Sequence, residues 1–184
     1  MNNLEPINQT KLYGLNKYLD ELTNFYKKGI YPNKILFSGQ KGIGKSTLAF
    51  HFINYVLTLN SEDQYDLQNH TINIQSSEFK TIQNKSNTNL IIIDINDDKK
   101  TIDINQIREL IVKLNKSSFN NKPRFVLIDN IELLNVNSIN ALLKVLEEPN
   151  QNINFILIHN NKKILNTLLS RCINFKINLS NYDY

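Results

Sequence analysis

The chain has 184 residues, a length that suits one α/β domain with a sizeable core. Its net charge of +4 is a mild excess, and without a dense Lys/Arg run the sequence shows no autonomous DNA-binding patch. One Cys excludes a disulfide framework and a Cys-rich zinc site, and no stretch resembles a signal peptide or spans a membrane. We therefore expect a cytoplasmic protein without a membrane partner.

The first predicted helix covers about residues 16–28, and Gly29 suits the position just after its C-terminus. Its apolar side chains recur at helical spacing and are Leu15, Leu19, Leu22 and Phe25 or Tyr26. An apolar run at residues 35–37 then favours a short buried strand.

Residues 39–47 follow this strand and fit G-x-x-x-x-G-K-[ST], the Walker A phosphate loop. Between a strand and a helix, such a loop directs backbone N–H groups at an anion. The candidate contacts to ATP are Gly39, Gln40, Lys41, Gly42, Ile43, Gly44, Lys45, Ser46 and Thr47. Lys45 is expected on the β and γ phosphates, and the Ser46 hydroxyl on Mg²⁺.

The helix after the loop is predicted to end near Asn60, with Leu48, Phe52, Tyr55 and Leu59 on one stripe. Residues 61–89 are polar and difficult to interpret. We expect mostly loop there, with a possible short strand at residues 71–74 and a possible helical turn. Residues 90–93 form a continuous apolar run, typical of a central strand, that ends in Asp94.

Asp103 and Gln106 form a capping pattern that predicts the start of the next helix. Its expected buried stripe is Ile104, Ile107, Ile111 and Leu114. A second apolar strand at residues 125–128 ends in Asp129.

A helix is then predicted at residues 136–148, stopped by Pro149. Its apolar positions are Ile139, Leu142, Leu143 and Leu146. A strand at residues 153–158, a short helix at 162–169 and an edge strand at 173–177 complete the series.

Alternating strands and helices predict an α/β fold with a parallel sheet flanked by helices. Ligands of such sheets bind at the carboxyl ends of the strands, so the phosphate loop, Asp94, Asp129 and Asn160 could share one site. Asp129 and Asp94 compete as the carboxylate that serves Mg²⁺. Many phosphate-loop ATPases place a water-orienting Glu directly after the Asp that ends such a strand. Here Asn130 stands there and Glu132 lies two residues further on, so efficient hydrolysis is not expected.

Arg171, just before the edge strand, could reach the γ-phosphate of a neighbouring subunit as an arginine finger, although the sequence alone favours a solvated Arg. Cys172 suits a small packed residue better than a nucleophile. His51 and His70 lack metal-like partners, and we assign them no role.

Residues 138–149, Ser-Ile-Asn-Ala-Leu-Leu-Lys-Val-Leu-Glu-Glu-Pro, and residues 167–172, Thr-Leu-Leu-Ser-Arg-Cys, closely resemble the bacterial clamp-loader AAA+ subunits. These are the delta-prime and gamma/tau subunits of DNA polymerase III. Residues 102–110 match the family's helix ahead of Walker B, and the resemblance runs from about Leu12 to Ile177.

The resemblance implies a P-loop NTPase fold of AAA+ type over residues 1–180, with a tail at 181–184 and a five-stranded parallel sheet of order 5-1-4-3-2. It gives Asp129 the Walker B position, Asn160, or His159, the sensor 1 position, and Arg171 the trans arginine finger. The implied partners are gamma/tau and delta subunits, with the sliding clamp and primed DNA reached through the assembly.

Delta-prime is the better match. The gamma/tau subunits carry Asp-Glu in Walker B, where this chain has Asp129-Asn130. They also carry a four-Cys zinc module after the phosphate-loop helix, whereas residues 61–89 of this chain contain no Cys. The complete phosphate loop departs from many delta-prime subunits and leaves an active gamma/tau-type ATPase as the alternative. A small-molecule kinase of the phosphate-loop class is a weaker one. The family's lid and collar domains are not expected in these residues, so the sequence reads as a truncated or a shortened subunit.

Overall fold

The computed structural model describes residues 4–95, 99–115, 120–147, 152–160 and 165–178. Contacts divide the chain into two compact units. The helical unit is Met1–Tyr31, Gly42–Asn87 and Ile177–Tyr184, and the sheet unit is Pro32–Lys41 and Thr88–Lys176. No helix in the described ranges is long and apolar enough to cross a membrane.

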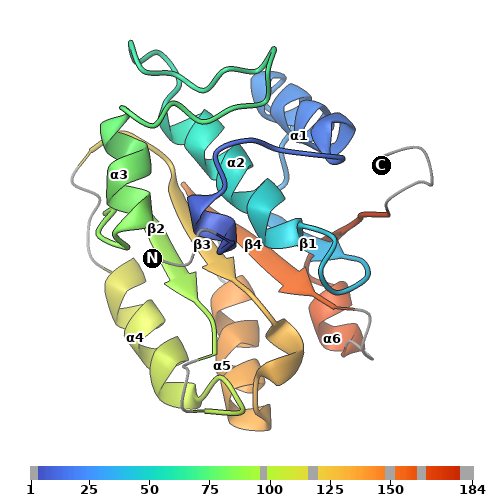
Figure 1. Ribbon diagram of the computed structural model, residues 1–184. Coiled ribbons are helices and arrows are strands. Elements are labelled where there is room, and N and C mark those ends of the chain that lie inside the picture. Colours follow the sequence, from blue (N-terminus) through green and yellow to red (C-terminus); the bar gives the residue numbers. More distant parts are fainter. Residues whose placement is uncertain (1–3, 96–98, 116–119, 148–151, 161–164, 179–184) are drawn as a thin grey trace. The chain divides into compact units, whose positions relative to one another are not determined.

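Among the described residues, five strands form one sheet in the sheet unit. They are β1 (Lys34–Ser38), β2 (Leu90–Ile93), β3 (Arg124–Ile128), β4 (Ile153–His159) and β5 (Ile173–Lys176). Figure 1 shows β2, β3 and β4 side by side in this sheet. Every pairing is parallel and the order is β2-β3-β4-β1-β5. The predicted order 5-1-4-3-2 is confirmed, and β5 lies at an edge as predicted.

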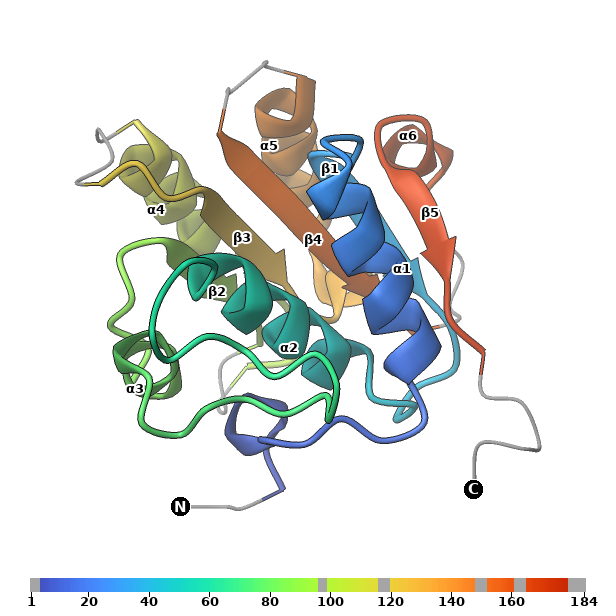
Figure 2. The same ribbon diagram turned by 90° about the horizontal axis from the view of Figure 1, so that it is seen from above.

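Two helices of the sheet unit, α4 (Ile104–Leu114) and α5 (Val136–Glu147), lie side by side against the strands (Figure 2). The apolar side chains of the two helices pack in one buried cluster with every second side chain of the strands. The main buried members of this core are Leu36, Ile93, Ile107, Leu110, Leu114, Val126, Ile128, Leu142, Val145, Leu146, Phe155 and Leu157. The sheet is thus fixed by burial as well as by backbone hydrogen bonds.

The capping pattern placed the start of α4 correctly, but the predicted buried stripe was partly wrong. Leu110 is buried, whereas Ile104 and Ile111 are only half-buried. The tertiary contacts rotate the helix so that the face centred on Ile107, Leu110 and Leu114 meets the core. Helical spacing alone permits either face.

The helical unit contains η1 (Pro6–Asn8), α1 (Asn16–Lys27), α2 (Lys45–Leu57) and α3 (Ser77–Gln83). Helix α2 contacts the other three. Every residue from Leu48 to Leu57 is buried. The predicted stripe is thus confirmed at Leu48, Phe52 and Tyr55, but the other faces of the helix are buried as well. A helix that is apolar on all sides belongs inside a protein, and α2 has this composition. Leu59 lies beyond the end of the helix and is half-buried.

Residues 61–89 hold more structure than we predicted. The seven-residue helix α3 is capped by Ser76 and buries Phe79 and Ile82 at i and i+3. The possible strand at residues 71–74 is absent, since Thr71 forms only isolated bridges with Lys11 and Asp66.

Some predictions fall outside the described residues. They concern Pro149, the start of the short helix at Lys162 and the tail at 181–184. The described short helix is α6 (Asn166–Leu169). A single core over residues 1–180 stays a prediction.

Candidate functional site

The phosphate loop begins in the sheet unit, where β1 ends at Ser38. Strand β1 lies between β4 and β5, and Ser38 pairs with His159 of β4. Gly39, the first loop residue, is buried, whereas Gln40 and Lys41 are exposed. The first third of the loop therefore leaves the sheet at its carboxyl edge, where ligands of parallel sheets bind.

The rest of the loop lies in the helical unit and leads into α2. Gly44 is the N-cap of α2 and has φ +88°, a left-handed conformation that favours glycine. A Cβ added there would lie 3.1 Å from Leu15 Cδ1, so any side chain would be both strained and crowded. Gly42, at φ +86°, has the same conformation but open space around it.

The first turn of α2 has the chemistry of an anion site. Lys45 is buried, Ser46 and Thr47 are half-buried, and the first turn contains no acidic residue. A helix N-terminus carries a partial positive charge, to which Lys45 adds a full one. These residues fit the phosphates of ATP, and the Ser46 hydroxyl fits the hard-oxygen ligand set of Mg²⁺.

Asp129 and Asn130 follow β3 at the carboxyl edge of the sheet. The Asn130 backbone N–H donates to Asp129 Oδ1 at 2.7 Å. Asn130 has φ 54° and ψ 47°, and Asn is among the few non-glycine residues that adopt this left-handed conformation readily. A Glu at position 130 would bear a larger backbone cost.

Four side chains beyond the ends of β2, β3 and β4 form a continuous polar network. Asn130 Nδ2 donates to Asp94 Oδ1 at 2.9 Å. Asn160 Nδ2 donates to Asn130 Oδ1 at 2.9 Å and to Glu132 Oε1 at 3.0 Å. We name Asp94, Asn130, Asn160 and Glu132 the edge network.

Within the edge network, Asp94 acts as a hydrogen-bond acceptor. Its Oδ1 accepts from Asn130 and also from the Ile95 backbone N–H at 2.7 Å. This arrangement favours Asp94 as a fixed acceptor for Asn130. The choice of Asp129 for Mg²⁺ stays a prediction.

Arg171 lies just after α6, and its guanidinium is bonded within the chain. Its Nε donates to Glu147 Oε1 at 3.1 Å, and Nη2 forms an ion pair with the same carboxylate. Its Nη1 donates to the Thr167 carbonyl oxygen at 2.8 Å and to Ser170 Oγ at 3.3 Å. An exposed ion pair is weak, about 0–1 kcal/mol, so Glu147 would yield readily to a phosphate.

The remaining titratable candidates have structural surroundings. Burial raises the pKa of the Cys172 thiol to about 11, against the lowering effect of Lys34 and Arg171. This agrees with a packed residue rather than a nucleophile. His51 is fully buried in α2, and its Nδ1 lies 2.7 Å from Tyr65 Oη.

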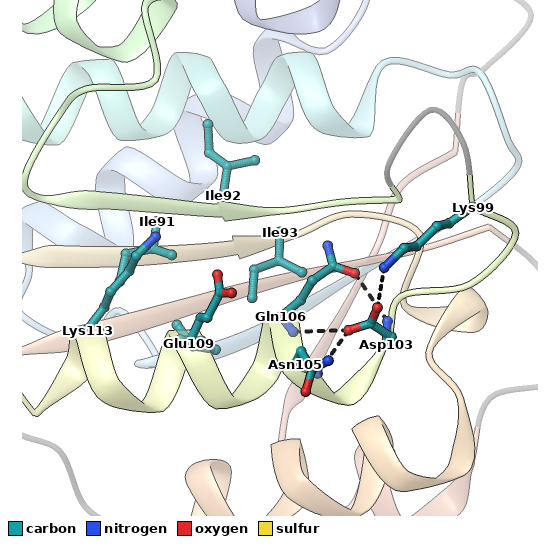
Figure 3. A pocket seen from close by; sticks show the side chains of 10 residues that line it. Ile91, Ile92, Ile93, Lys99, Asp103, Asn105, Gln106, Glu109 and Lys113 are labelled. Carbon is teal, nitrogen blue, oxygen red and sulfur yellow. Dashed lines mark hydrogen bonds and ion pairs between the residues drawn. The ribbon is translucent and has the colours of Figure 1, made fainter.

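A separate pocket of about 390 Å³ lies between β2 and α4 (Figure 3). Its charged lining residues are Lys99, Asp103, Glu109 and Lys113. Figure 3 shows Asp103 engaged by Lys99 and by the first turn of α4. The pocket contains no residue of the phosphate loop or of the edge network.

The structure thus brings Asp129 and Asn160 to one edge of the sheet unit, together with the start of the loop at Gly39. Glu132 had no predicted role from the sequence. The signal for it was present, because an acidic residue three positions after a strand-ending Asp lies within one tight turn of that Asp. Contact with Asn160 was not visible in the sequence.

The sequence matches the family described as DNA polymerase III, delta subunit, over residues 14–181. It is 31% identical over 179 residues to DNA polymerase III subunit gamma of Buchnera aphidicola subsp. Schizaphis graminum, covering 95% of this chain and 46% of that protein. It is 31% identical over 162 residues to DNA polymerase III subunit delta′ of Buchnera aphidicola subsp. Baizongia pistaciae, covering 83% of this chain and 48% of that protein. The chain therefore spans about half the length of these relatives.

Solved structures support the fold. A DNA polymerase III gamma subunit-related protein from Thermotoga maritima superposes with a TM-score of 0.53 at 18% identity, covering 89% of this chain and 46% of that one. The Bacillus subtilis DNA clamp loader delta protein superposes with a TM-score of 0.50 at 14% identity, covering 86% of this chain and 42% of that one. With the sheet order, these likenesses show a P-loop NTPase fold of AAA+ type.

Proposed function

Because the chain belongs to the family described as DNA polymerase III, delta subunit, we propose that it is a delta-prime-like clamp-loader subunit. It binds ATP with Mg²⁺, hydrolyses it slowly, and offers Arg171 to the ATP of a neighbouring subunit. The gamma/tau and delta subunits are its partners, and through them it acts on the sliding clamp and primed DNA.

The proposed nucleotide site uses the loop residues Gly39–Thr47. Lys45 and the backbone of the loop hold the phosphates, and Ser46 and Asp129 serve Mg²⁺. The left-handed Gly44 supports this assignment, since a phosphate needs close approach to the backbone there. Asn160 takes the sensor 1 position, where its amide N–H groups hold Asn130 and Glu132.

Slow turnover is supported by the identity of Asn130 and by the hydrogen bonds of its side-chain amide. Its amide follows Asp129 where many ATPases have Glu, and an amide accepts no proton. Both ends of this amide are engaged, Nδ2 by Asp94 and Oδ1 by Asn160. The chain therefore suits nucleotide binding better than rapid hydrolysis.

Nucleotide binding tests the first part of the proposal. We expect tight Mg²⁺-dependent ATP binding in isothermal titration and its loss in Lys45→Ala, because the buried cation on the phosphates is removed. Lys113→Ala, which removes a positive charge from α4, is the matched control and should bind as the wild type does. Retained affinity in Lys45→Ala would refute the loop assignment.

A gamma/tau-type ATPase is the second candidate. It is favoured by the complete phosphate loop and by the 31% identity to a gamma subunit. Steady-state hydrolysis by the purified chain separates the two, because brisk turnover without partners fits only the gamma/tau type. Reconstitution with sister subunits, clamp and primed DNA tests clamp loading, and failure to associate with them would exclude both.

A further inference from the structure

Glu132 is a carboxylate with one satisfied and one unsatisfied oxygen. It lies in η2 (Ile131–Leu133), which Asp129 and Asn130 separate from β3, and its Oε1 accepts from Asn160. Its Oε2 is buried and has no hydrogen-bond partner among the described residues. A buried unsatisfied acceptor costs about 1–3 kcal/mol, and more when charged, so it requires an explanation such as a bound water or a catalytic role.

The position of Glu132 relates it to the start of the phosphate loop within the sheet unit. Its anchor, Asn160, directly follows His159, the β4 residue that pairs with Ser38 of β1. Gly39 directly follows Ser38. Asn160 and the first loop residue therefore leave neighbouring strands at equivalent positions on the same edge.

Asn160 commits both of its amide hydrogens to the edge network. An Asn side-chain nitrogen has two N–H donors, and here Nδ2 bonds both Asn130 Oδ1 and Glu132 Oε1. Glu132 is therefore held in place by the residue at the sensor 1 position. Asn130 is held by the same residue, but its amide has no capacity to take a proton.

We infer that Glu132 is the water-orienting carboxylate of this chain, positioned by Asn160, in place of the Glu that Asn130 replaces. The inference rests on the proposed function. A water donates a hydrogen bond to Glu132, and its oxygen forms a bond to the γ-phosphorus of ATP. The bond from that phosphorus to the β–γ bridging oxygen breaks, its electron pair stays on ADP, and the water proton passes to Glu132. The products are ADP and inorganic phosphate.

Single-turnover hydrolysis of radiolabelled ATP by an excess of the 184-residue chain tests this assignment. We expect Glu132→Gln to lower the rate constant at least about tenfold, at the low end for a general base, with ATP affinity unchanged within about twofold. Glu132→Asp keeps the carboxylate on a shorter side chain. Its rate constant should lie between those of the wild type and Glu132→Gln. Glu109→Gln, on the exposed face of α4, is the matched control for loss of charge and should hydrolyse as the wild type does.

The positioning role of Asn160 has its own readout. Asn160→Ala should lower the rate, and the double variant with Glu132→Gln should be no slower than Glu132→Gln alone, because the two act as one unit. Additive losses would overturn the positioning role.

The outcomes separate the inference from its premise. Wild-type chain that binds ATP without any single-turnover hydrolysis, or Glu132→Gln that hydrolyses at the wild-type rate, would overturn the role of Glu132 and leave ATP binding intact. Wild-type chain that binds no ATP would overturn the proposed function itself. If Glu132→Gln fails to fold, as judged by thermal melting, the single-turnover rate constants of Glu132→Asp and Asn160→Ala test the role of Glu132 instead. Wild-type rates in both would overturn it.

Discussion

His51 shows how a residue with no evident role in the sequence acquires one from its surroundings. It lies in α2, is fully buried, and contacts Tyr65 both by its Nδ1 and by an edge-to-face ring arrangement. Burial disfavours the charged imidazolium and lowers the pKa of His51 from 6.5 to about 4. The residue is therefore a neutral part of the interior of the helical unit.

This pKa shift predicts a loss of stability in acid. Between pH 6.5 and about 4 the unfolded chain binds a proton at His51 that the folded chain does not, so the free energy of unfolding falls as the pH falls. The full effect is about 3 kcal/mol at most. Urea titrations of wild type and His51→Gln over this range should show a shallower pH dependence in the variant. Parallel curves would contradict the shift.

Arg171 makes a second prediction at the residue scale. Its guanidinium is exposed enough to exchange Glu147 for a phosphate. Arg171→Ala should leave the chain's own ATP affinity within about twofold and lower ATP hydrolysis by the reconstituted complex at least about tenfold, because an arginine finger acts on the neighbouring subunit. Arg108→Ala, on the exposed face of α4, is the control. Equal turnover by both complexes would refute the finger.

At the scale of elements, α4 illustrates a helix start that local sequence specifies. Asp103 Oδ1 accepts from the backbone N–H groups of Asn105 and Gln106, at 2.9 and 3.3 Å. In return the Asp103 N–H donates to Gln106 Oε1 at 3.1 Å. The capping box is complete, so backbone donors at this helix end are satisfied by the side chains of Asp103 and Gln106.

Removal of this cap should destabilise the fold modestly. Asp103→Ala should lower the Tm by about 2–6 °C, the shift expected from the loss of one N-cap in a chain of this size. Asp103→Asn, an equally good N-cap without the charge, should retain most of the Tm. Differential scanning calorimetry measures both. A similar fall in the two variants would show that the ion pair with Lys99, rather than the cap, is responsible.

At the scale of the whole molecule, the sheet unit is discontinuous in the chain. Strand β1 belongs to it through residues 32–41, whereas the other strands lie in residues 88–176. Since β1 pairs with both β4 and β5, it joins the edge strand β5 to the rest of the sheet. The sheet unit therefore depends on a segment far away in the sequence.

A fragment of residues 88–176 should consequently fail to fold cooperatively. Without β1, β5 has no neighbouring strand and the core loses Leu36. Far-UV circular dichroism should show a broad, shallow thermal transition for the fragment and a sharp one for the full chain. A sharp transition of the fragment would contradict the dependence on β1.

Local and periodic signals in the sequence determined much of this protein. Apolar runs marked β1 to β4, alternation of apolar and polar residues marked β5, the capping pattern marked α4, and the Gly-rich motif marked the phosphate loop. These features succeed because backbone geometry and helix capping depend on a few adjacent residues.

The tertiary structure decided which faces are buried and which distant side chains meet. It buried α2 on every side, turned Leu110 of α4 to the core, and formed α3 in a polar segment. Above all, it joined Asn160 to Glu132 and Asn130 across two strands. Such contacts depend on strand order and on the left-handed turn after β3, and neither follows from the spacing of residues along the chain.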